Sequence, residues 1–271
     1  MWRGRPRPRK AMATESITRE RVLQKIQAPV ARLALNNPPV NVIDIPLMEE
    51  LARNIADIEA RPEISVLVLS SAGNAFSAGV DVAAHTADKI ESMLSSFHTV
   101  IRALVASKKV TIAAVHGPCL GGGAELAMVC DLVYTSEDAQ WGFPEIKLGC
   151  YPPVAATALS ALIGQKRAAE LVLTGRTITG SEAATIGLAT GAVPKQTLEE
   201  TVEKVTRNLS YLSPAALAVA KKASYAWDSM HFDKGLARAE KIYFEDLMKT
   251  EDAHEGINAF LEKRTPIWRG K

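Results

Sequence analysis

The sequence of 271 residues has only three cysteines and contains no run of about eighteen apolar residues, the length that a membrane-spanning helix requires. The cysteines, Cys119, Cys130 and Cys150, form no CxxC pair, which argues against a disulfide framework or a zinc cluster and favours a reducing cytoplasm. No two histidines are spaced i, i+4, so we also expect no metal site. These absences predict a soluble protein without a membrane partner.

Nucleotide-binding and serine-hydrolase motifs are missing as well. The glycines of the segment 117–123 do not have the GxGxxG spacing. The segment also lacks the Gly-Lys-Ser/Thr that a P-loop requires. Ser77 is not part of a GxSxG elbow, so a serine hydrolase is not indicated.

Positive charge is concentrated at one end of the chain. The formal net charge is +2, but five basic residues and no acid lie in positions 1–10, so the remainder carries −3. This mildly acidic body gives no electrostatic footprint for nucleic acid. We expect residues 1–15 to form a basic tail that is disordered or artefactual, because it has no apolar segment of the secretory type. If the tail is instead a transit peptide, the protein belongs in an organelle matrix.

Two almost uninterrupted apolar runs predict strands that are buried on both faces of a parallel sheet. These runs are Ile64–Leu69 and Val110–Val115. Further extended segments are expected at 22–26, 30–35, 132–135 and 140–142.

Helical spacing of apolar residues is typical of three N-terminal segments and of nearly everything after Val154. The expected helices are 44–59, 88–107, 122–131, 154–163, 165–174, 181–187, 197–211, 213–227, 229–248 and 251–263. Strands interleaved with helices, followed by helices alone, predict an α/β fold with a helical C-terminal appendage.

The most informative motif is Gly121-Gly122-Gly123, which enters a predicted helix two residues before Glu125. A glutamate in a first helical turn can simply complement the helix dipole. Three glycines, however, are tolerated where the backbone must approach another group closely, and the bare N–H groups of a helix start can bind an oxyanion. The motif therefore indicates an oxyanion site beside a carboxylate.

A second glutamate, Glu145, follows Gly142-Phe143-Pro144. Alone it would be interpreted as a surface acid of a loop. Paired with Glu125 in one pocket it gains a function, because two neighbouring carboxyl groups raise one pKa, so that one acts as acid and the other as base on a shared water.

A third segment, Ala75–Asp81, follows the first buried strand. The carboxyl ends of parallel strands are where α/β sheets bind ligands, although a simple tight turn is an alternative interpretation. We expect this segment to form the opposite wall of the site.

These motifs resemble the crotonase (enoyl-CoA hydratase/isomerase) superfamily over residues 16–271. The similarity is carried by Phe76–Asp81, Gly117–Ala127, Phe143–Gly149, Leu173–Arg176 with Ala183–Leu188, and Glu255–Arg264. Within the superfamily, the chain is most similar to cyclohexa-1,5-diene-1-carbonyl-CoA hydratases. That likeness is carried by Val80-Asp81 with His85, Met93-Leu94 with Phe97-His98, and the segment from Ile242–Met248 to Trp268.

The resemblance implies a spiral of ββα units in residues 16–195 that holds the active site, and a helical trimerisation region in residues 196–271. It implies catalytic Glu125 and Glu145, with the N–H groups of Ala78 and Gly122 as the oxyanion hole for a thioester carbonyl. Ala78, Gly79, Val80, Asp81 and Lys263 would contact coenzyme A. The implied substrate is an acyl-CoA thioester and no separate cofactor is needed, since coenzyme A is part of the substrate. The implied assembly is a homotrimer or a dimer of trimers.

One departure from the resemblance concerns the acyl pocket. Where ordinary enoyl-CoA hydratases have a glycine-rich stretch, this chain has Gly149-Cys-Tyr-Pro-Pro-Val-Ala-Ala-Thr157, which is bulkier and stiffer. The change argues against linear crotonyl-CoA as the best substrate and is compatible with a ring.

Two alternatives to a hydratase remain open. A double-bond isomerase of the same fold needs one carboxylate, and a superfamily member could serve as an RNA-binding or structural protein. The two acids favour hydration, and the acidic body argues against RNA.

Overall fold

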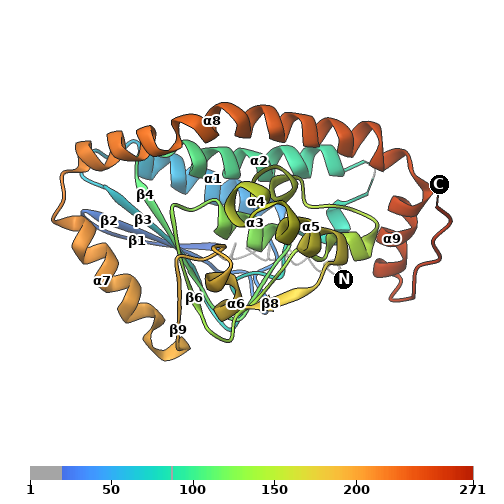
Figure 1. The fold of residues 1–271 in the computed structure, drawn as a ribbon, viewed down its shortest axis with the longest axis horizontal. Helices are drawn as coiled ribbons and strands as arrows, with labels where there is room; N and C mark the ends of the chain where they lie inside the picture. The colour runs from blue at the N-terminus through green and yellow to red at the C-terminus, as the bar shows by residue number, and fades with distance from the viewer. Residues whose placement is uncertain (1–19, 87, 271) are drawn as a thin grey trace, which may run out of the picture.

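The centre of the molecule is a six-stranded sheet, seen in a computed structural model that describes residues 20–86 and 88–270 (Figure 1). The predicted basic tail lies outside the described residues. The strands, in spatial order, are β1 (Val22–Gln27), β2 (Val30–Leu35), β3 (Val66–Ser71), β4 (Val110–Val115), β6 (Leu132–Ser136) and β9 (Gly191–Val193). β1 pairs with β2 in antiparallel fashion and the other pairs are parallel. The parallel strands therefore end at one common edge.

Helices cover both faces of this sheet, as the apolar runs predicted. In β3, Leu67 and Leu69 point into the larger core with α1 (Ile45–Glu59) and α2 (Ile90–Ala106). Val66 and Val68 point into a second core that Leu198 and Val202 of α7 (Leu198–Ser210) close. Because side chains alternate along a strand, both sets are buried only when helices lie on both faces.

A second, smaller sheet has three strands. It contains β5 (Pro118–Leu120), β7 (Gln140–Gly142) and β8 (Thr177–Thr179). Twice in succession, one strand enters the large sheet, the next enters the small sheet, and a helical turn follows. The first unit, β4–β5, leads into α3 (Gly122–Met128), and the second, β6–β7, leads into the 3₁₀ helix η2 (Pro144–Leu148). This repetition confirms the expected ββα organisation and places one glutamate at the start of each helical turn.

The C-terminal part is helical but not wholly so. Its α-helices after η2 are α4 (Pro153–Ile163), α5 (Gln165–Thr174), α6 (Gly180–Thr185), α7, α8 (Pro214–Glu245) and α9 (Glu251–Leu261). Besides η2, the described chain has the short 3₁₀ turns η1 (Val82–Ala84), η3 (Lys195–Thr197) and η4 (Leu247–Lys249). The chain after Val154 was expected to be almost wholly helical, and the structure adds the two short strands β8 and β9, which were missed because strands of three residues leave no alternation to detect. The large sheet and the small sheet supply their pairing.

The two helices expected at 213–227 and 229–248 are one continuous helix, α8. Residues 215–234 contain neither proline nor glycine, so nothing removes a backbone donor or favours a cap there. Figure 1 shows α8 running the length of the molecule, and it packs on α2 and α4. Such packing supports a long helix better than propensity does.

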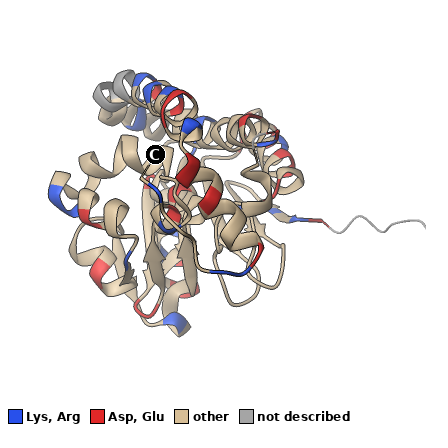
Figure 2. Cartoon of the chain, turned by 90° about the vertical axis from the view of Figure 1, so that its right-hand side faces the viewer, with Lys and Arg blue, Asp and Glu red and all other residues tan. Residues whose placement is uncertain are grey.

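Charged residues of both signs are interspersed along the helices (Figure 2). None of the helices in the described part of the chain combines the length and apolarity needed to cross a bilayer. The domain boundary at residues 195/196 and the oligomerisation role of the helices that follow it stay predictions.

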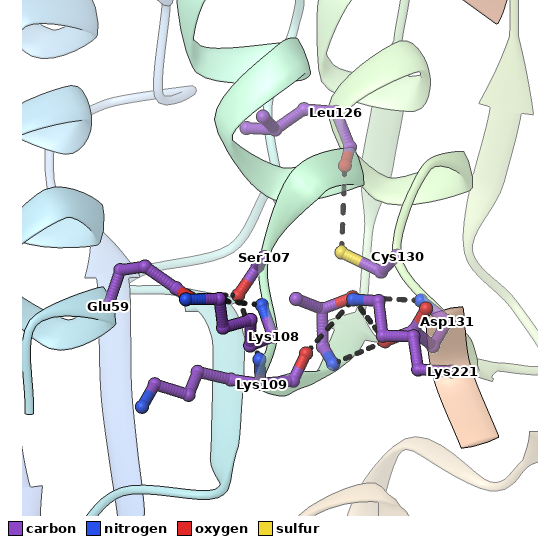
Figure 3. Close-up of polar contacts among 9 residues, drawn as sticks. Glu59, Ser107, Lys108, Lys109, Leu126, Cys130, Asp131 and Lys221 are labelled. Carbon is purple, nitrogen blue, oxygen red and sulfur yellow. Dashed lines mark hydrogen bonds and ion pairs between the residues drawn. The ribbon is translucent and has the colours of Figure 1, made fainter. Parts of the chain in front are cut away.

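A buried ion pair fixes the first part of α8 to the sheet (Figure 3). The Nζ of Lys221 lies 2.8 Å from a carboxylate oxygen of Asp131 and donates to the carbonyl of Lys109. The side chains of Lys221 and Asp131 are 9% and 12% exposed. Asp131 also accepts hydrogen bonds from the N–H and hydroxyl of Thr111 on β4. The start of α8 is therefore attached at the ends of β4 and α3.

Removing one member of this pair should destabilise the protein. Lys221→Met leaves the buried carboxylate of Asp131 without its cation, so we expect a loss of about 3 kcal/mol in the free energy of unfolding, measured by urea titration. Lys222→Met, on an exposed neighbour in the same helix, should change it by less than about 0.5 kcal/mol. Equal unfolding midpoints for the two variants would contradict this account.

Candidate active site

Three chain segments meet where the parallel strands end, and they enclose a cavity of about 80 Å³. We call it the carboxylate cavity. Its lining includes six of the predicted site residues, namely Ala78, Gly79, Val80, Gly122, Glu125 and Glu145. Two predicted residues lie elsewhere. Asp81 caps η1 by accepting from the N–H of Ala83, and Lys263 is exposed beyond the end of α9.

The glycines of the motif are needed because other groups occupy the space of a side chain. A Cβ on Gly121 would lie 2.6 Å from Oε1 of Glu145, and a Cβ on Gly122 would lie 2.5 Å from Cγ2 of Val80. Gly121 also has a φ of 52°. The close approach inferred from the sequence is thus an approach of the backbone to Glu145 and Val80.

Glu125 is buried and held from one side. It is 3% exposed, and its Oε1 accepts hydrogen bonds of 2.9 Å from the N–H groups of Val154 and Ala155 in the first turn of α4. Burial raises the pKa of Glu125 to about 7, although the two N–H donors oppose the rise because they stabilise the charged form. One carboxylate oxygen is fixed in this way, and Oε2 accepts no hydrogen bond from the described residues.

Glu145 lies against Gly121 and is electrostatically coupled to Glu125. Its Oε2 is shielded from solvent and has no hydrogen-bond partner among residues 20–86 and 88–270. Burial, and then the negative charge of Glu125, raise the pKa of Glu145 to about 8. Between these two pKa values, the pair therefore holds on average about one proton and one negative charge.

The opposite wall presents two backbone N–H groups. The segment 76–81 is attached to its neighbours by hydrogen bonds from Ala78 N to the carbonyl of Val40 (2.9 Å) and from Gly79 N to the hydroxyl of Ser77 (3.0 Å). Within the described residues, the N–H of Val80 and the N–H of Gly122 donate to no group. Both residues line the carboxylate cavity.

This arrangement corrects the expectation for Ala78. Its N–H is already used by Val40, so Ala78 lines the cavity without offering a donor. The free donor of the segment is Val80, two residues later. The sequence could not show this, because which N–H is free depends on the bridge between Ile43 and Val80.

Tyr151 belongs to the segment 149–157 that was expected to reshape the acyl pocket, whereas Tyr243, Phe97 and His85 were not assigned to the site from the sequence. Tyr151 and Tyr243 form one side, with ring centroids 5.3 Å apart. Burial raises the pKa of the Tyr243 phenol, and the nearby Cys150 and Glu145 raise it further. Phe97 and His85 also line the cavity. Phe97 has the spacing of a helix core residue and Tyr243 belongs to α8, so neither is linked to the glutamates by any sequence signal.

Comparison with known proteins adds three findings. The family model for enoyl-CoA hydratase/isomerase matches residues 25–271. The chain is 32% identical to cyclohexa-1,5-dienecarbonyl-CoA hydratase of Thauera aromatica, over 89% of this chain and 93% of that protein. It is 35% identical to 2,3-dehydroadipyl-CoA hydratase of Escherichia coli, over 92% and 95%.

A solved structure has the same fold. The crystal structure of an enoyl-CoA hydratase from Mycobacterium avium subsp. paratuberculosis matches with a TM-score of 0.83 at 27% identity, covering 92% of this chain and 99% of that one. The fold is thus that of the crotonase superfamily.

The raised pKa of Glu145 makes a prediction about stability. Between its ordinary pKa of 4.5 and about 8, the folded protein keeps a proton that the unfolded chain has lost, so stability falls as the pH rises through this window. Glu145→Gln removes this effect. The free energy of unfolding of the variant minus that of the native protein should therefore be larger at pH 8 than at pH 5 by more than about 1 kcal/mol, measured by urea unfolding at both pH values. Glu49→Gln, on an exposed glutamate of α1, is the control and should show no such gain. A gain in both variants, or in neither, would refute the assignment.

Proposed function

Because the chain belongs to the enoyl-CoA hydratase/isomerase family and is an enzyme of the hydratase type, we propose that it uses Glu125 and Glu145 to add water to an α,β-unsaturated CoA thioester. One observation carries the proposal. Two carboxyl groups, and two residues whose backbone N–H groups donate to nothing within the residues that the structure describes, line the same small cavity.

The reaction follows from this placement. Glu125 takes a proton from water, and the oxygen attacks the β carbon of the substrate. The electrons of the double bond move toward the thioester, and its carbonyl oxygen gains negative charge. The N–H groups of Val80 and Gly122 donate to that oxygen, and one such donor is worth about 3–4 kcal/mol. Glu145 then delivers its proton to the α carbon, which completes the addition.

The roles of the two acids rest on their surroundings. The donors from Val154 and Ala155 stabilise a charged Glu125, as a base requires. Glu145 has no such partners on Oε2 and sits beside the charge of Glu125, which favours its protonated form. The difference between the two surroundings supports Glu125 as the base and Glu145 as the acid.

The acyl group is the finer part of the proposal. The relative from Thauera aromatica is named for a cyclic dienoyl-CoA, and the cavity wall of this chain contains Tyr151, Pro152 and Pro153. We propose a compact, cyclic dienoyl-CoA as the preferred substrate, with crotonyl-CoA as the linear comparison.

The coenzyme A moiety and the assembly complete the proposal. Lys263 is exposed beyond α9, where it would reach coenzyme A phosphates of its own or a neighbouring subunit. A homotrimer or a dimer of trimers is supported by the large apolar side chains that the C-terminal part exposes, among them Leu212, Val219 and Trp268.

Substitution of either glutamate tests the proposed function. Glu125→Gln and Glu145→Gln should each lower kcat for hydration by at least about 100-fold, because each removes one proton transfer. Binding of the CoA thioester should change little, since the donors and the cavity shape remain. Glu49→Gln serves as the control. Mass spectrometry of the product distinguishes hydration, which adds one water, from isomerisation, which leaves the mass unchanged. Undiminished turnover in both variants would overturn the roles.

The pH dependence gives a second test. Hydration requires one charged and one protonated carboxyl group, so kcat/KM, which reports the ionisation of the free enzyme, should follow a bell-shaped profile with its maximum between the values of about 7 and about 8. Activity falls on the acid side because the base is protonated, and on the alkaline side because the acid has lost its proton. Stopped or continuous assays from pH 5 to 10 measure this, and a profile that is flat through the window contradicts a shared proton.

A further inference from the structure

The carboxylate cavity is small for an acyl group. Its volume of about 80 Å³ is far below the roughly 300–1,000 Å³ of ordinary ligand pockets. A second cavity of about 520 Å³ lies next to it, between α3, α4 and α8. Among the residues that line this second cavity are Met128, Val129, Ala158, Leu162, Phe232 and Ile242.

One side chain belongs to both cavities. Tyr151 is the residue that appears in the lining of each. Its hydroxyl donates to the carbonyl of Ala239 on α8 at 2.5 Å, and its ring packs against Tyr243. Tyr151 is therefore fixed to α8 at its hydroxyl and along its ring, at the boundary between the two spaces.

The backbone elements also run continuously from one cavity to the other. α3 supplies Glu125 to the carboxylate cavity and Met128, one turn later, to the second cavity. Likewise, α8 supplies Tyr243 to the first and Ala239, one turn earlier, to the second. The second cavity is thus an extension of the first along the same elements, interrupted by Tyr151.

The second cavity is mainly apolar, although Asp131, Thr157 and Arg238 also line it, and it is open on one side. Leu162 and Ile242 are 45% and 40% exposed there. Exposed apolar side chains gathered in a hollow are typical of a binding site for an apolar group. An aliphatic acyl chain that continues from the reacting carbons would cover them.

We propose that Tyr151 determines acyl-group specificity by closing the carboxylate cavity against this second cavity, which is shaped for the distal, apolar part of an acyl chain. With Tyr151 in place the enzyme accepts compact acyl groups, and a smaller residue at this position admits long linear ones. This inference rests on the proposed function and identifies the residue that limits its substrate class.

The test compares two linear substrates, crotonyl-CoA and decenoyl-CoA, in steady-state hydration. Tyr151→Ala and Tyr151→Val should raise the ratio of kcat/KM for decenoyl-CoA to that for crotonyl-CoA by at least about 10-fold over the native protein, the effect of a few methylene groups gaining a pocket. Tyr151→Phe keeps the ring and loses the hydrogen bond to Ala239, so its ratio should stay within about threefold of the native one. An equal gain in Tyr151→Phe would contradict the role of the ring.

A blocking variant shows where the longer chain lies. Ala158→Phe adds bulk to the second cavity alone, and in combination with Tyr151→Ala it should abolish the gain for decenoyl-CoA. The single Ala158→Phe variant should hydrate crotonyl-CoA as the native protein does. A gain that survives in the double variant, or an unchanged ratio in both Tyr151→Ala and Tyr151→Val, refutes the inference. If the native protein hydrates neither substrate nor a cyclic dienoyl-CoA, the proposed function fails instead, so the two failures are distinguishable.

Discussion

A single negative charge shared by two buried carboxyl groups is the constraint on which the rest of the site depends. Burial disfavours the charge on either Glu125 or Glu145, and each charge disfavours the other. The N–H groups of Val154 and Ala155 stabilise the charge at Glu125, while Gly121 leaves room for Glu145 close by. The helix start at α4, the glycine turn before α3 and the 3₁₀ helix η2 must therefore be placed together, because no one of them creates the pair alone.

The fold achieves this placement through repetition. Each ββα unit carries its chain from the large sheet to the small sheet and then into a helical turn, so the two glutamates arrive at one edge from successive units. The loop after β3 reaches the same edge and is fixed there by Val40 and Ile43. These hydrogen bonds occupy the N–H of Ala78, while the N–H of Val80, a residue of the cavity lining, has no acceptor among the described residues, so a few backbone contacts decide which amide is available.

Much of this could be predicted from the sequence where local chemistry is decisive. The runs Ile64–Leu69 and Val110–Val115 indicated strands covered on both faces, and the glycines beside Glu125 indicated close backbone approach. What could not be predicted depends on distant partners. Strands β8 and β9 exist because neighbouring strands pair with them, and α8 is continuous because α2 and α4 support it. Tyr243 reaches the cavity only because α8 crosses the molecule, and no local pattern records such a crossing.

The course of α8 has a consequence for how proteins of this kind diversify. The two carboxyl groups that we propose move protons belong to α3 and η2, whereas the proposed boundary of the acyl space is built from Tyr151 and from side chains on a helix more than two hundred residues into the chain. That helix is secured to the sheet at its first part by Lys221 and Asp131, well before it reaches Tyr243. Replacements along its inner surface can therefore accumulate without disturbing the pair of glutamates, so the proposed catalytic pair can be inherited unchanged while substrate preference drifts.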